Sequence, residues 1–171
     1  PQGISLQSGD KIDADIVVTA TGLELLFVGG ADITVDGQGG DVADRLVYKG
    51  TMIEGIPNFA VALGYTNASW TLKVDLSSDF VTRLMNRMRD TGMRQCTPVN
   101  NDPSVQPAPL FALNSGYINR SSADLPKQGT KFPWQVYQSY VRDFRALKLS
   151  SLHEAMEFSN PGPNRPAAAM P

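Results

Sequence analysis

The sequence has 171 residues, of which 42% are hydrophobic and 19% are charged, and its formal net charge is −2. This composition is too apolar for a disordered chain. A protein held on nucleic acid mainly by phosphate contacts needs a basic surface, which this charge balance does not provide. No apolar run approaches the roughly 20 residues of a transmembrane segment. We therefore expect a folded protein with no nucleic-acid partner and no transmembrane segment.

The chain contains one cysteine, Cys96, and one histidine, His153. A single cysteine excludes an internal disulfide framework, and the two residues together exclude most zinc sites. A reducing compartment is the simplest interpretation, which predicts a cytoplasmic location. Cys96 follows Arg94 and could be an activated thiol, but a buried and inert side chain is favoured. We interpret His153 as structural or solvent-exposed.

Short strands are predicted in the first third of the chain. Alternating residues 4–6 and 11–13 flank a turn and predict a hairpin. The β-branched run at residues 15–20 predicts a central strand covered on both faces. Residues 59–63 predict another buried strand. Further short strands are expected at residues 33–35 and 46–48.

The clearest predicted element is a long amphipathic helix. Apolar side chains recur every fourth residue from Leu72 to Met88, which is the helical period. Acidic residues lie early and arginines late, so both complement the helix dipole. Candidate N-cap residues occupy positions 66, 67 and 69, and Gly92 supplies a stop.

The C-terminal half is predicted to be less regular. Four prolines between Thr97 and Pro109 predict a long loop. A second helix is expected after Phe132, because Pro133 suits a first helical turn and apolar residues follow at steps of three and four. Residues 159–171 are expected to form a disordered tail, so the predicted domain comprises residues 1–158.

The common short catalytic motifs are absent. The chain has no Gly-x-Ser-x-Gly, Gly-x-x-x-x-Gly-Lys-Ser/Thr, His-Glu-x-x-His or Cys-x-x-Cys. The glycines at residues 37–40 are interpreted as a turn, since a dinucleotide fingerprint needs a strand before it and a helix after it. Asp13 and Asp15 are interpreted as solvated surface residues. No catalytic or metal-binding residue is therefore predicted.

One segment could carry chemistry. Residues 64–73 join the end of a predicted strand to the start of the long helix. Such a junction exposes the unpaired first-turn N–H groups and the positive end of the helix dipole. It favours an anion or a polarised carbonyl by about 0.3–1 kcal/mol at an exposed site. A capped helix end with nothing bound is an equally good interpretation.

Three segments resemble the class B flavoprotein monooxygenases, which comprise the flavin-containing and Baeyer–Villiger monooxygenases. Residues 14–23 resemble the family's Asp-x-x-x-x-Ala-Thr-Gly strand, which closes a dinucleotide domain. Residues 49–60 and 64–73 are similar to the branch that includes the ethionamide-activating monooxygenases. Residues 125–134 resemble the C-terminal region of the same branch. The match spans roughly residues 4–158.

The resemblance implies an α/β fold, the C-terminal part of a two-dinucleotide-binding-domain flavoprotein, with strands of the FAD domain, two long helices and extended loops. The chain lacks both Gly-x-Gly-x-x-Gly fingerprints, which lie upstream in the family. The implied full-length enzyme uses FAD and NADPH and inserts one oxygen atom of O₂ into a ketone or a soft heteroatom such as a sulfide, through a C4a-peroxyflavin. The alternative is a non-catalytic α/β binding or interaction module derived from such an enzyme.

The resemblance also implies which residues bind the cofactor. Backbone N–H groups would face the pyrimidine end of the flavin, from Asn67, Ala68, Ser69, Trp70, Thr71 and Leu72. Thr21 and Gly22 would line the nucleotide crossover. Without the sister strands expected upstream, the strand predicted at residues 15–20 would also expose apolar surface, and the fragment would self-associate.

Overall fold

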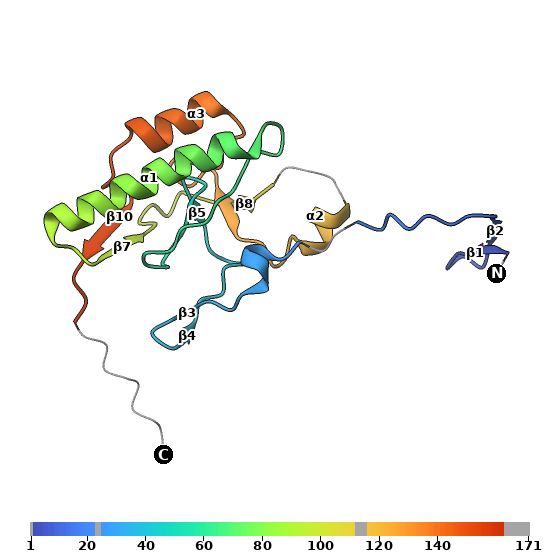
Figure 1. Ribbon diagram of the computed structural model, residues 1–171. Helices are drawn as coiled ribbons and strands as arrows, with labels where there is room; N and C mark the ends of the chain where they lie inside the picture. The colour runs from blue at the N-terminus through green and yellow to red at the C-terminus, as the bar shows by residue number, and fades with distance from the viewer. Residues whose placement is uncertain (1, 23–24, 112–115, 163–171) are drawn as a thin grey trace, which may run out of the picture.

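The computed structural model describes residues 2–22, 25–111 and 116–162. In it, two helices pack side by side and cover pairs of short strands (Figure 1). The helical elements are a 3₁₀ turn at Phe27–Gly30 (η1), α1 at Trp70–Thr91, α2 at Gly116–Ser121, α3 at Tyr140–Phe144 and a π-helical turn at Arg145–Leu149 (η2). The π-helical turn continues α3 without a break, and both pack against α1. An extended N-terminal arm leads away from this body.

All the described strands are short and pair two by two in antiparallel ladders. The pairs are β1 (Gly3–Ser5) with β2 (Lys11–Asp13), β3 (Thr34–Val35) with β4 (Gln38–Gly39), β5 (Val47–Tyr48) with β6 (Met52–Ile53), β7 (Gln95–Pro98) with β10 (Met156–Ser159), and β8 (Pro107–Pro109) with β9 (Lys127–Gly129). Within the described ranges these ladders do not join into a larger sheet. The chain is therefore α/β in content.

The long helix is confirmed. It begins at Trp70, two residues before the first predicted apolar position, and its buried face includes Leu76, Phe80 and Leu84. Gly92 follows the helix in a left-handed conformation with φ 69°, and its N–H donates to the carbonyls of Met88 and Arg89. Glycine adopts this conformation without steric cost. The sequence therefore predicted both the period of α1 and its end.

Two predicted hairpin features are also confirmed. The strands at residues 3–5 and 11–13 pair in register, with Ile4 opposite Ile12. The predicted strand at 33–35 appears as β3, which is joined to β4 by Asp36 and Gly37 at φ 53° and 78°. Two successive residues with positive φ are typical of a tight hairpin turn, and Asp-Gly is a preferred sequence there.

The prediction of a central strand at residues 15–20 is wrong for this chain. This segment is extended but pairs with no strand among the described residues, and Ile16, Val17 and Val18 are 83%, 50% and 83% exposed. A strand needs partners for its N–H and C=O groups, and the described chain supplies none here. Residues 59–63 likewise form no strand beyond a single bridge from Ala60 to Met52, and only some of their side chains are partly buried.

The second predicted helix begins seven residues later than expected. Residues 133–139 are not helical, and α3 starts at Tyr140. Trp134 is buried, and its ring packs edge-on against the ring of Tyr48 with 5.4 Å between the ring centres. The backbone N–H of Val136 donates to the side chain of Gln128, which holds this segment in a non-helical conformation. The apolar spacing around Trp134 therefore reflects tertiary packing and not a helical face.

The proline-rich stretch is more regular than predicted. β7 ends at Pro98 and β8 is bounded by Pro107 and Pro109. Among the described strands, β7 and β8 each pair with one other strand. Each therefore has a free edge, and proline is tolerated there because its missing N–H is not needed for pairing. Near the other end, β10 extends to Ser159 and the Asn160 side chain accepts from Arg94 N–H at 2.9 Å. The remainder of the predicted tail, from residue 163, lies outside the described residues.

The main core gathers side chains from α1, β5 and the segment before α3. Tyr48, Phe80 and Trp134 form its aromatic centre. Cys96 is buried in this core, and burial raises the pKa of its thiol, so it is the inert cysteine that the sequence favoured. His153 is exposed, with its ring 5.1 Å from that of Phe158. Across the described ranges, no helix is both long and apolar enough to span a bilayer.

The exposed apolar arm leads to a prediction of self-association. Unpaired extended backbone with apolar side chains is a template for pairing between chains. We expect the 171-residue chain to form oligomers in light scattering, and Val18→Lys to shift them toward monomer. Met85→Lys is the matched control, because Met85 is an exposed apolar residue of α1. A monodisperse wild-type monomer that binds no apolar dye would contradict this expectation.

Candidate functional site

The segment that leads into α1 is an exposed loop held between two buried residues. Tyr65 precedes the loop and Lys73 follows it, and both are buried. All seven residues from 66 to 72 are exposed. The loop therefore presents its backbone to solvent while its ends are fixed in the body of the molecule.

Gly64 and Trp70 pack so closely that no side chain fits between them. A Cβ atom on Gly64 would lie 2.1 Å from Cδ2 of the Trp70 ring. Any other residue at position 64 would displace Trp70, which is the first residue of α1. The glycine thus lets the chain fold back against the start of the helix.

Hydrogen bonds fix the loop to the segment before α3. The backbone N–H and the hydroxyl of Thr66 both donate to Oε1 of Gln138, at 2.9 and 3.0 Å. The side-chain amide of Asn67 donates to the carbonyl of Gln138 at 3.2 Å. Two segments about 70 residues apart in sequence therefore hold one another in place.

The first-turn N–H groups of α1 have no hydrogen-bond partner within the part of the chain that the structure describes. Ser69 is the N-cap residue, with φ −58° and ψ 129°, but its side chain accepts no hydrogen bond from a first-turn N–H. Its Oγ lies 2.8 Å from Oγ1 of Thr71 instead. First-turn N–H groups have no partner within a helix, so those of α1 remain available to a ligand. This geometry can stabilise negative charge or polarise a carbonyl.

The structure brings together six of the eight predicted cofactor-binding residues. Asn67, Ala68, Ser69, Trp70, Thr71 and Leu72 all lie on this exposed loop and the first turn of α1. Thr21 and Gly22 lie on the arm, which runs past α2 and away from α1 (Figure 1). There the guanidinium of Arg120 donates to Thr21 O at 3.5 Å. Within this chain, Thr21 and Gly22 are thus not part of the same site.

A buried ion pair supports the loop and was not predicted. Lys73 Nζ lies 3.1 Å from Oδ2 of Asp143, and the two side chains are 1% and 3% exposed. Lys73 Nζ also lies 5.4 Å from the centre of the Tyr65 ring and 3.5 Å from the carbonyl of Tyr137. A Cβ atom on Gly50 would come within 2.7 Å of the same Nζ, so glycine leaves room for the ammonium group. The sequence did contain a signal for this buried charge, because Lys73 lies on the apolar face of the predicted helix, three residues before Leu76.

Burial shifts the pKa of all three polar groups in this cluster. It lowers the pKa of Lys73 and raises that of Asp143, while the opposite charge of each partner counteracts the shift. Burial also raises the pKa of Tyr65, and the nearby Asp143 raises it further. Neither charge of the pair would be stable here without the other.

Lys49 is a second buried lysine. Its Nζ donates to Ser150 Oγ at 2.7 Å and to the Ser151 carbonyl at 3.1 Å. The same atom lies 5.1–5.5 Å from three ring centres, those of Tyr48, Phe80 and Phe132. Burial lowers the pKa of Lys49 from 10.5 to about 8. Its ammonium group is held by two hydrogen bonds and by cation–π contacts.

Comparison with curated proteins places these features in a family context. The chain is 46% identical over 152 residues to the FAD-containing monooxygenase EthA of Mycobacterium tuberculosis, which covers 89% of this chain and 31% of that protein. It is 43% identical over 152 residues to EthA of Mycolicibacterium smegmatis, with the same coverage. It is 44% identical over 147 residues to AlmA of Acinetobacter baylyi, described as a probable FAD-binding monooxygenase, covering 85% of this chain and 30% of that protein.

The resemblance inferred from the sequence is thereby confirmed. The chain is similar over most of its length to FAD-containing monooxygenases and spans about 31% of the length of the curated relatives that it matches. No protein-family model matches the chain, and no solved structure matches it.

Removing one partner of the buried ion pair should strongly destabilise the fold. Asp143→Asn leaves Lys73 buried without a counter-charge, which we expect to cost about 3–5 kcal/mol in chemical denaturation. Asp79→Asn is the matched control, because it breaks the half-buried pair between Lys148 and Asp79, which water still reaches, and it should cost less than about 1 kcal/mol. Replacing both buried partners, with Lys73→Met and Asp143→Leu, should restore much of the loss. Equal losses of stability in Asp143→Asn and Asp79→Asn would show that the buried pair is no more important to the fold than the pair between Lys148 and Asp79.

The depressed pKa of Lys49 predicts an increase of stability with pH. Between pH 8 and about 10, the unfolded chain keeps a proton on Lys49 that the folded chain releases, so Lys49 should contribute an increase in the free energy of unfolding. Above pH 10 the free energy of unfolding should decrease. Burial raises the pKa of Tyr48, so the folded chain keeps the phenolic proton of Tyr48 that the unfolded chain releases.

Denaturation at several pH values measures this trend. Lys49→Met should flatten the increase between pH 8 and 10, whereas Lys131→Met, which removes an exposed lysine, should leave it intact. An unchanged slope in the Lys49 variant would show that another group causes the increase.

Proposed function

We propose that the chain is the C-terminal part of a flavin-dependent monooxygenase that uses FAD and NADPH. The observation that carries the proposal is the 46% identity over 152 residues to an FAD-containing monooxygenase. The proposed substrates are O₂ and a ketone or a sulfide, and the proposed location is cytoplasmic. Because the chain spans about a third of such a protein, the activity belongs to the longer polypeptide.

The loop at residues 67–72 fits a role in binding the flavin. Its free first-turn donors suit the pyrimidine end of an isoalloxazine ring, where reduced flavin carries negative charge near N1 and C2=O. The buried Tyr65 and Lys73 on either side hold the loop rigidly, so little ordering entropy is lost on binding. When bound, FAD would supply the redox and oxygen-activating chemistry, and NADPH the reducing equivalents.

In this proposal the described residues bind and orient the flavin. Ser69 and the first turn of α1 would donate backbone N–H groups. Gln138 and the buried Lys73–Asp143 pair would keep those donors in position. Thr21 and Gly22 would contact the nucleotide only if the arm packs against upstream parts of the longer protein.

The proposal is tested on the full-length protein that carries this chain. We expect it to copurify with a yellow flavin and to consume NADPH and O₂ when given a sulfide or a ketone. Oxygen-electrode traces combined with product analysis measure both the reaction and the substrate class. A full-length protein that binds no flavin and consumes no O₂ would instead be the non-catalytic α/β module.

Ser69→Pro in that full-length protein should impair flavin function with little effect on stability. Proline matches the observed φ of −58° and removes one backbone donor. If that donor faces the flavin, the rate of product formation should fall by about 10²-fold, the cost of one lost electrostatic donor, while more hydrogen peroxide is released.

Ser69→Ala is the matched control, because it removes the hydroxyl but keeps the backbone N–H. It should retain nearly full product formation per bound flavin. A lower melting temperature with normal product formation in Ser69→Pro would show that this residue only caps the helix.

A further inference from the structure

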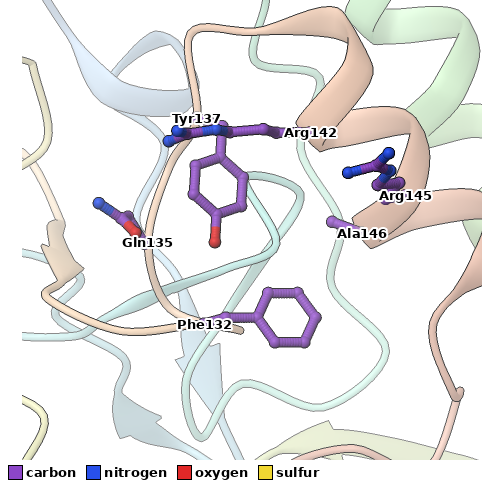
Figure 2. Close-up of a pocket in the computed structure, with 6 residues that line it drawn as sticks. All are labelled: Phe132, Gln135, Tyr137, Arg142, Arg145 and Ala146. Atoms are coloured by element: carbon purple, nitrogen blue, oxygen red, sulfur yellow. The ribbon is translucent and has the colours of Figure 1, made fainter.

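A hollow of about 350 Å³ lies between α3 and the segment that precedes it (Figure 2). Six residues line it: Phe132, Gln135, Tyr137, Arg142, Arg145 and Ala146. Figure 2 shows the rings of Tyr137 and Phe132 bordering the space, with Gln135 on one side and Arg145 and Ala146 on the other. The volume suits a small organic molecule.

Among the residues that the structure describes, the polar side chains around this hollow form neither ion pairs nor side-chain hydrogen bonds. Within the described ranges, Arg142 and Arg145 belong to none of the ion pairs. The side-chain amide of Gln135 and the hydroxyl of Tyr137 likewise form no hydrogen bond in that part of the chain. None of the six lining residues is acidic. The lining of this hollow therefore carries several donors and no carboxylate.

Two nearby carboxylates are already engaged. Asp143, between the two arginines in sequence, is buried against Lys73. Asp79 of α1 pairs with Lys148 at 2.9 Å. The buried Lys49 lies 5.5 Å from the centre of the Phe132 ring, but the negative charge of Glu154 acts on it, so the attraction for an anion comes from Arg142 and Arg145.

One of the two arginines is oriented before any ligand binds. Cζ of Arg142 lies 5.6 Å from the centre of the Tyr137 ring, a cation–π distance. Planar guanidinium groups suit phosphate and carboxylate because they can donate two parallel hydrogen bonds. The faces of Phe132 and Tyr137 offer an apolar surface to a flat group attached to that anion.

We propose that this hollow binds a small organic anion, with a phosphate or carboxylate held by Arg142 and Arg145 and a planar apolar group held against Phe132 and Tyr137. The site is separate from the loop at residues 67–72. It does not depend on the proposed monooxygenase activity.

Titration of the ¹⁵N-labelled chain that carries Val18→Lys, the substitution expected to shift oligomers toward monomer, with phenyl phosphate tests the proposal. We expect saturable chemical-shift changes at Gln135, Tyr137, Arg142 and Arg145. Benzoate distinguishes carboxylate from phosphate preference. Phenol lacks the charge and inorganic phosphate lacks the ring, and each should bind at least about tenfold more weakly than phenyl phosphate.

Substitution of the arginines identifies the groups responsible. Arg142→Gln and Arg145→Gln should each weaken phenyl phosphate binding by about tenfold, since each removes a charge-assisted contact. Both side chains are exposed, so the melting temperature should not change. Arg87→Gln is the matched control, because Arg87 is an exposed arginine of α1 that does not line the hollow.

Three results would overturn the proposal. These are unchanged affinity in the Arg142/Arg145 double variant, equal affinity for phenol and phenyl phosphate, and an equal loss in Arg87→Gln. Shift changes confined to residues outside the hollow would overturn it as well.

Discussion

The ion pair between Lys73 and Asp143 is the contact on which the arrangement of both candidate sites depends. Each charge is nearly inaccessible to water, so burying either one alone would cost several kcal/mol. Their mutual attraction in a medium of low dielectric offsets that cost only when the two atoms are close. The start of α1 and the start of α3 are thereby held in one relative position, and Gly50 leaves the space that this position requires.

The same pair explains why one surface carries free donors and another carries free cations. Lys73 is the first buried residue after the exposed loop, so fixing it fixes the direction in which the first turn of α1 points. Asp143 is the acidic residue of α3, and its burial against Lys73 removes it as a partner for Arg142 and Arg145. Among the described residues, this single buried contact therefore leaves N–H groups available at the start of α1 and leaves Arg142 and Arg145 outside any ion pair beside the hollow.

What the sequence could predict follows from how local each signal is. The period of α1 and its end at Gly92 are encoded within one segment, so the helix could be predicted from the sequence. Six of the cofactor-binding candidates are contiguous, so they lie together on the loop and the first turn of α1, and their role in binding flavin stays a prediction. The helix expected from Pro133 was wrong, because Trp134 is apolar to fill the core beside Tyr48 and not to form a helical face. Lys73 was missed because its partner lies 70 residues away, and no local pattern reveals that contact.

The arm at residues 14–22 also shows that a local sequence pattern does not reveal contacts with distant parts of the chain. Its β-branched residues favour extended backbone, and the backbone is extended, but Ile16 and Val18 are largely exposed. Local preference specifies the conformation of a strand, whereas its partners come from elsewhere in the fold. The β-branched pattern of the arm therefore predicts extended backbone, and the strand expected there is wrong because no strand among the described residues pairs with it.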